Sequence, residues 1–247
     1  KEHHLIISAH HIICDGWSFG IILEDLGTLY SAYKTNEIPA LPIVENFSSY
    51  ADDEQEYVGS ELHAKTEIFW TDQYSNSIPE LNLPTDFPRP KLRTYKSERL
   101  DFPFNTQLLD QLKKIGLKSG CSFVTTLMSA FEIFLYKQTG QDDIVIGLPS
   151  AGQAANSRIQ LVGHCVNLLP LRSKLDSNKS FRAYLKERKI SLLDAYDHKQ
   201  LSFGELLQKL PLQRDPSRVP LVPVVFNIDL GMTNLVNFQD LEFKVIS

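Results

Sequence analysis

The start of the chain changes from a continuous apolar run to an amphipathic pattern. Leu5-Ile6-Ile7 is a short apolar run, which indicates a buried strand. Apolar residues then recur at helical spacing, which predicts an amphipathic helix from residue 17 to about residue 34. These residues are Phe19, Ile22, Leu23, Leu26, Tyr30 and Tyr33. Residues 8–18 therefore lie in a strand-to-helix connection, a place where rigid scaffolds hold reactive groups.

Strand and helix patterns alternate along the rest of the chain. Helical spacing predicts helices over residues 47–75, 105–119, 122–138 and 180–198. Alternating or β-branched runs predict strands over residues 95–104, 143–147, part of 161–171 and 222–229. Residues 77–91 hold prolines at positions 79, 84, 88 and 90, and proline this dense excludes a helix or a central strand. Strands that alternate with helices define the α/β class.

Composition is that of an ordinary globular chain. Of 247 residues, 43% are hydrophobic and 22% are charged, and the net charge of −5 does not favour nucleic acid or an anionic membrane as a partner. No apolar run is long enough to span a bilayer. Three cysteines, an odd and small number, fit the reducing cytoplasm. Both ends have the pattern of core strands, so we expect this sequence to be cut at both ends from a larger domain.

The predicted connection holds the candidate chemistry, SAHHIICDGWS at residues 8–18. Because side chains alternate along a strand, His10 and His11 are expected to point in opposite directions, so that only one faces a given cleft. A neutral imidazole can accept a proton near pH 7, since the ordinary pKa of histidine is about 6.5. Asp15 can cap the following helix or anchor the loop through a charge pair. Gly16 allows a tight turn or a close backbone approach.

Two other interpretations compete with catalysis. A lone histidine in a strand is more often a packed side chain than a catalyst. A zinc site would draw on His3, His4, His10, His11 and Cys14. We do not favour zinc, because adjacent histidines diverge and no second cluster at ligand spacing completes a tetrahedral set. From the residues alone, His11 is the candidate catalytic group.

Five motifs follow one another along the chain. They are HHIICDG at 10–16, QDDIVIGLPSAG at 141–152, VGHCVNLLPLR at 162–172, DHKQLSF at 197–203 and RDPSRVPL at 214–221. The first resembles the HHxxxDG motif of the condensation domains of nonribosomal peptide synthetases, and the others resemble further motifs of that family in the same order. The third is similar to GxFVNTxPxR, which epimerisation-type relatives lack. Cyclisation-type relatives have a DxxxxD motif instead of the histidine pair, so condensation is the better fit.

The resemblance implies a chloramphenicol acetyltransferase-like two-lobed fold, with each lobe a mixed sheet covered by helices. Residues 1–91 would form the end of the N-terminal lobe with the histidine motif and the interlobe linker, and residues 92–247 most of the C-terminal lobe. In many relatives an Arg pairs with the motif Asp across the lobes. That position is Gln153 here, and Arg158 is the nearest candidate substitute, which leaves the partner of Asp15 open. Asp215 and Arg218 of the last motif are expected to fix a loop.

The implied reaction is amide formation between a carrier-bound acyl or peptidyl thioester and a carrier-bound aminoacyl acceptor. His11 would be catalytic, as a general base or a positioning group, and His10, Asp15 and Gly16 would support it. The residues implied to line the channel are Trp17, Ser150, Asn167 and Arg172, whereas His164 is interpreted as a mere neighbour of its motif. The resemblance implies no metal and no directly bound cofactor, because phosphopantetheine arms arrive on the carriers.

The implied partners are upstream and downstream carrier (thiolation) domains and a neighbouring adenylation domain, with neither nucleic acid nor membrane. Two alternatives stay open. One is a free-standing acyltransferase that uses acyl-CoA and shares the histidine motif. The other is an inactive domain that recruits carriers or other proteins, and the intact His11 and Asp15 weigh against it.

Overall fold

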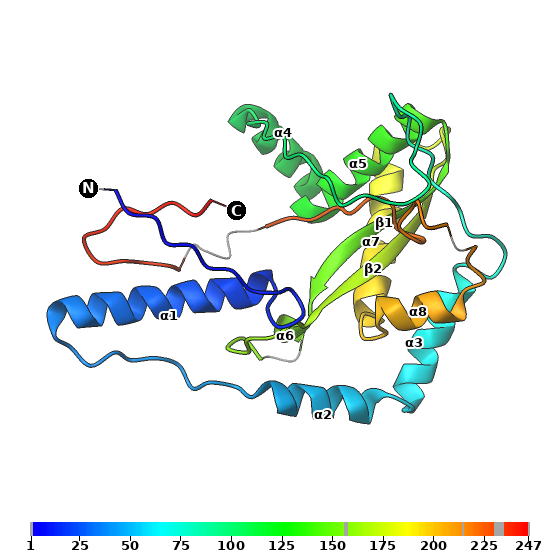
Figure 1. Ribbon diagram of the computed structural model, residues 1–247. Coiled ribbons are helices and arrows are strands. Elements are labelled where there is room, and N and C mark those ends of the chain that lie inside the picture. The colour runs from blue at the N-terminus through cyan, green and yellow to red at the C-terminus, as the bar shows by residue number, and fades with distance from the viewer. Residues whose placement is uncertain (1, 156–157, 214, 230–234, 247) are drawn as a thin grey trace. The chain divides into compact units, whose positions relative to one another are not determined.

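The computed structural model describes residues 2–155, 158–213, 215–229 and 235–246 (Figure 1). The chain forms two compact units. The first comprises Lys1–Ser60, Ala151–Asn167 and Asp229–Ser247, and the second comprises Glu61–Ser150 and Leu168–Ile228. The sequence also predicts a boundary near residue 92 between the two lobes of the complete domain. That boundary does not correspond to the division into these two compact units, and it stays a prediction.

The first unit is built around two helices, α1 (Gly16–Thr35) and α2 (Phe47–Tyr57), and also holds the short α6 (Gly152–Ala155). The start of α1 agrees with the predicted helix, and Asp15 caps it by accepting a hydrogen bond from the Ser18 N–H at 2.9 Å. Asn36 follows the last residue of the helix and caps it in the left-handed conformation, with φ of 56°. Residues 45 and 161 form an isolated parallel bridge within this unit.

The second unit holds most of the regular structure. Its helices are α3 (Glu61–Asp72), α4 (Thr106–Lys118), α5 (Phe123–Thr139), α7 (Phe181–Asp197) and α8 (Phe203–Lys209). Strands β1 (Asp143–Ala151) and β2 (Val166–Lys174) are neighbours in a two-stranded sheet. The last residue of β1 and the first two residues of β2 belong to the first unit. Figure 1 shows α7 running behind the two strands, and α5 packs against both α4 and α7.

The core of the second unit brings side chains of the strands and of these helices together. Its largest fully buried members include Trp70, Tyr74, Met128, Ile144 and Ile146. The two aromatic residues, Trp70 and Tyr74, pack inside this core. Both also satisfy their polar ends, because the Trp70 indole N–H donates to the His198 carbonyl at 2.7 Å and the Tyr74 hydroxyl donates to the Pro170 carbonyl at 2.8 Å.

The predicted helices are largely confirmed, and polar caps explain where they begin. Asn105, Ser122, Ser180 and Ser202 each accept a hydrogen bond from a backbone N–H in the first turn of α4, α5, α7 and α8. The predicted helix over residues 47–75 is wrong in one respect, because it divides into α2 and α3. Gly59, with φ of 82°, lies in the break.

Three predicted strands are corrected. Residues 5–7 and 95–104 form no strand, and Leu5, Ile6 and Tyr95 are exposed. Residues 222–229 form only an isolated parallel bridge, in which Val225 pairs with Gly147. A strand needs a hydrogen-bonded neighbour, and among the described residues none forms a ladder with these segments. The strand at 143–147 is confirmed and extends to Ala151.

The mixed content of helices and strands confirms the predicted α/β class. In the described part of the chain, no single helix has the length and apolar character needed to cross a membrane. Among the described helices, only α4 and α5 taken together pass that test, and a bend of 105° separates them.

Candidate functional site

The histidine pair lies in a tight turn rather than in a strand. The Ile13 N–H donates to the His10 carbonyl at 3.0 Å, and the Ile12 N–H donates to His10 Nδ1 at 3.1 Å. The His10 imidazole is therefore used inside its own turn, while His11 is exposed and directed elsewhere. The two side chains do differ in direction and partner, but the cause is the turn and not strand alternation.

Asp15 is the buried centre of the site, with only 3% of its surface exposed. Its Oδ1 accepts from the Ser18 N–H at 2.9 Å, and the Ser18 hydroxyl lies 2.8 Å away. Its Oδ2 accepts from the Cys165 N–H at 3.0 Å and from Gln153 Nε2 at 2.8 Å. Burial alone would raise the pKa of Asp15, but these hydrogen bonds outweigh it and hold the pKa below its usual 3.8. The carboxylate is therefore ionised at neutral pH.

Gln153, not Arg158, is the partner of Asp15. The Gln153 side chain is fully buried, and its Oε1 has no hydrogen-bond partner within the described residues. The proposed substitute, Arg158, is instead paired with Asp53 and lies 3.7 Å from Glu45. The candidate Arg158 therefore does not reach Asp15, because these two carboxylates of the α2 region hold its guanidinium. At this position Asp15 is held by a hydrogen bond from an uncharged amide in place of an ion pair with an arginine.

Hydrogen bonds join the segment 158–165 to the first turn of α1. The Ser18 hydroxyl accepts from the Gly163 N–H at 3.0 Å and lies 2.8 Å from the Gly163 carbonyl. The Trp17 indole N–H donates to the Ile159 carbonyl at 3.0 Å. A side chain on Gly163 would overlap the ring of Phe47, so glycine is required for this close approach. Within the first unit, the HHxxxDG segment and residues 163–165 of the third motif therefore form one local structure.

His164 is a site residue that the sequence interpretation missed. Its Nδ1 lies 3.1 Å from His11 Nδ1, with the two rings 5.1 Å apart and close to perpendicular. Both side chains are exposed. The only signal in the sequence was a histidine inside the third motif, 153 residues from the first. Nothing local indicated that the two motifs would meet.

The remaining expected site residues have different environments. Gly16 is the first residue of α1, and Asn167 is half-buried in β2. Ser150 is buried in β1, and the Arg172 side chain is largely buried in the second unit. Arg172 binds both carboxylate oxygens of Asp143, at 2.8 and 2.6 Å. That ion pair gives Arg172 a structural role in the second unit, and its role in a channel stays a prediction.

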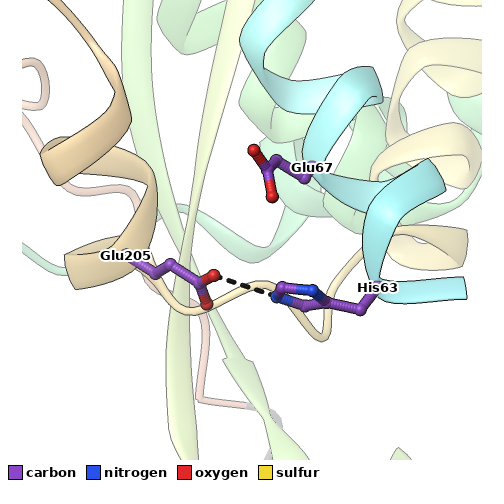
Figure 2. Close-up of side chains that lie close together, drawn as sticks. All are labelled: His63, Glu67 and Glu205. Atoms are coloured by element: carbon purple, nitrogen blue, oxygen red, sulfur yellow. Dashed lines mark hydrogen bonds and ion pairs between the residues drawn. The ribbon is translucent and has the colours of Figure 1, made fainter. Parts of the chain in front are cut away.

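A cluster of possible metal ligands lies in the second unit and not at the histidine turn. Figure 2 shows His63 and Glu67 on α3 and Glu205 on α8, with His63 Nε2 2.9 Å from Glu205 Oε1. Lys209 Nζ lies 2.9 Å from Glu67 Oε2 and 3.8 Å from Glu205 Oε1. An ammonium group thus already supplies the positive charge that the two carboxylates need. We assign the cluster to the packing of α8 on α3.

The last motif fixes a loop, as expected. Asp215 accepts from the Ser217 N–H at 2.8 Å, and Arg218 Nη1 donates to Asn82 Oδ1 at 2.9 Å and pairs with Glu80. Arg214, which opens this motif, lies outside the described residues.

An exposed imidazole on a turn ahead of a helix that a buried aspartate caps, within an α/β fold, fits the chloramphenicol acetyltransferase-like acyltransferase that the sequence resemblance implies. Comparison with known families agrees: residues 1–244 match the model of the Condensation domain. The chain belongs to the condensation domain family. Condensation domains of nonribosomal peptide synthetases are acyltransferases that form amide bonds.

The relatives are much longer proteins. The chain is 36% identical over 226 residues to tyrocidine synthase 3 of Brevibacillus parabrevis, covering 92% of this chain and 3% of that protein. It is 34% identical over 227 residues to bacitracin synthase 2 of Bacillus licheniformis, covering 92% of this chain and 8% of that protein. The chain thus spans only a small part of the relatives that it matches.

Solved structures give the same fold. A holo four-domain nonribosomal peptide synthetase bound to AMP and glycine matches with a TM-score of 0.80 at 22% identity, over 89% of this chain and 16% of that one. The SgcC5 protein of Streptomyces globisporus matches with a TM-score of 0.70 at 28% identity, over 82% of this chain and 45% of that one.

Proposed function

We propose that this chain forms the amide bond between a donor acyl or peptidyl thioester on an upstream carrier domain and an aminoacyl thioester on a downstream carrier domain. The acceptor α-amine attacks the donor carbonyl carbon, so a C–N bond forms and the donor C–S bond breaks. The thiolate leaves on the donor arm and takes up the proton that the amine gives away. The observation that carries this proposal is the exposed His11 on its anchored turn, in a chain of the condensation family.

His11 is the proposed catalytic residue. Its Nδ1 is the atom nearest His164, which leaves Nε2 as the nitrogen for the acceptor amine. There it either takes the proton of the attacking amine or holds that amine in line with the carbonyl. Asp15, His10 and Gly16 support the turn without touching substrate. Trp17, Ser150, Asn167 and Arg172 are proposed to line the channel that leads to His11.

The partners and setting belong to the same proposal. The donor and acceptor arms are phosphopantetheine groups of the two carrier domains, and an adenylation domain is a neighbour in the parent protein. The small fraction of each relative that this chain spans supports a multidomain context. Three buried, free cysteines support a cytoplasmic setting, where thiols stay reduced. Residues 1–91 and 92–247 are proposed to belong to the two lobes of the complete domain.

The test is intact-mass analysis of the acceptor carrier. The full-length protein that contains this sequence is incubated with loaded donor and acceptor carriers, and the parent is compared with His11→Ala. A donor-sized mass gain that His11→Ala loses supports the proposal. Acyl transfer from CoA with no transfer from carriers would instead indicate a free-standing acyltransferase. Equal gain in both proteins would remove His11 from the catalytic role.

A further inference from the structure

We infer that His164 is a positioning residue for His11, and that the contact between their Nδ1 atoms selects the tautomer of His11. The two atoms lie 3.1 Å apart, within hydrogen-bond distance. This inference rests on the proposed amide-forming reaction and adds a residue to it.

A hydrogen bond between two neutral imidazole nitrogens needs one donor and one acceptor. One Nδ1 must carry the hydrogen, and the other must offer its lone pair. If His164 donated, His11 would keep its own hydrogen on Nε2 and could not accept a proton there. If His11 donates, its Nε2 carries the lone pair. The contact therefore decides what His11 presents to substrate.

Both roles open to His11 need the same tautomer. A general base needs a lone pair on Nε2 to accept the proton of the amine. A positioning group must also accept a hydrogen bond from the amine N–H, because donating one would occupy the lone pair with which the amine attacks. His11 must then be protonated on Nδ1, and this hydrogen needs an acceptor. His164 Nδ1 supplies that acceptor at 3.1 Å.

The backbone on both sides of His164 is held in place, so the acceptor is not a loosely placed surface group. The Gly163 N–H is bound by the Ser18 hydroxyl at 3.0 Å, and the Cys165 N–H is bound by Asp15 at 3.0 Å. The Cys165 carbonyl also accepts from the Gly152 N–H at 3.0 Å. Opposite it, the turn that carries His11 is closed by its own hydrogen bonds. Both imidazoles thus project from tethered backbone.

The experiment compares two substitutions in the full-length protein. His164→Ala removes the acceptor, whereas His164→Asn retains a side-chain oxygen close to the place of Nδ1. His3→Ala is the matched control, because it removes another exposed histidine outside the site. We expect His164→Ala to lower kcat by about 3- to 10-fold, the effect of losing one exposed hydrogen bond, with little change in the KM for the acceptor carrier. His164→Asn should recover most of the loss, and His3→Ala should behave as the parent.

The second readout is the tautomer itself, measured by nitrogen NMR of labelled histidine without any substrate. The parent should show His11 protonated on Nδ1, and His164→Ala should shift it toward protonation on Nε2. A parent His11 protonated on Nε2, or a kcat unchanged in His164→Ala, would overturn the inference. If the parent forms no amide while the tautomer shift is present, the proposed reaction fails and the His11–His164 pairing stands.

Discussion

The four hydrogen bonds at Asp15 make its carboxylate the group whose loss should disturb the site most. The informative substitution is Asp15→Asn, which keeps the shape and removes the charge. The new amide oxygen can take the place of Oδ1 and keep the contacts with Ser18. The new NH₂ group then faces two donors, Gln153 Nε2 and the Cys165 N–H. Gln153 can rotate its amide and offer Oε1, which is buried without a partner in the described structure.

The Cys165 N–H cannot adapt in this way, because it belongs to the backbone. Leaving one buried donor unsatisfied costs about 1–3 kcal/mol. The other hydrogen bonds lose their charge assistance, about 1 kcal/mol each, and relief from burying a charge offsets part of this loss. We therefore expect Asp15→Asn to lower the free energy of unfolding by about 2–4 kcal/mol at pH 7.

The assay is urea unfolding of the parent and the variant between pH 7 and pH 3, combined with hydrogen exchange of the peptides around residues 15–18 and 163–165. Asp52→Asn is the control, because it removes an exposed carboxylate from α2 in the same unit. The folded state lowers the pKa of Asp15 below 3.8, so its contribution is present above that pH and is lost as pH falls through the lowered pKa. The difference between parent and variant should then narrow below about pH 4.

Equal stability of the two proteins at pH 7, within about 0.5 kcal/mol, would refute the assignment of Asp15 as the structural centre. A difference that stays constant down to pH 3 would show that the carboxylate charge is not its source. Hydrogen exchange gives an independent check, because the reasoning also fails if the variant exposes residues 163–165 no more than the parent does.

Two further predictions concern buried groups. Glu132 is fully buried and bound by Arg188 at 2.8 and 2.9 Å, so Arg188→Met should lower the free energy of unfolding by about 3–5 kcal/mol. The double variant Arg188→Met/Glu132→Leu should be less destabilised than Arg188→Met alone, because it leaves no unpaired buried charge. Urea unfolding that gave the double variant the summed losses of the two single variants would contradict this. Burial, with the charges of Asp15 and Glu54, raises the pKa of Cys165 to about 12. Iodoacetamide at pH 8 should therefore leave this thiol unlabelled in the folded protein. Rapid labelling of Cys165, measured by mass spectrometry, would contradict this prediction.

Helices were predicted more completely than strands, because the interactions that form a helix are local and those that form a sheet are not. The start of α5 depends on Ser122 and on apolar residues within a few turns, all of which are visible locally. The alternation at residues 95–104 identifies a possible face but names no partner, and the structure pairs it with none among the described residues. The apolar run at residues 5–7 was misjudged for the same reason.

The same difference between local and long-range interactions applies to the site. The motif at residues 10–16 marked His11 and Asp15 as candidates, because the spacing of these residues is local. The substitution of Gln153 for the Arg of relatives was also visible, but its consequence was not. Arg158 is nearby in sequence, and only the fold shows that Asp53 and Glu45 hold it while Gln153 reaches Asp15. The contact with His164 joins positions 153 residues apart, beyond any local pattern.

These contacts give the motif aspartate a role that does not require it to meet substrate. Asp15 binds the Cys165 N–H, and Ser18, which Asp15 orders, binds Gly163 on the other side of His164. The carboxylate that caps α1 therefore also places the imidazole that faces His11. Gln153 is an uncharged donor, so the buried carboxylate of Asp15 is stabilised by hydrogen bonds alone, among them those from the backbone N–H groups of Ser18 and Cys165. It follows that substitutions at Asp15 should act on the reaction through His164, so their effect on kcat should not add fully to that of His164→Ala.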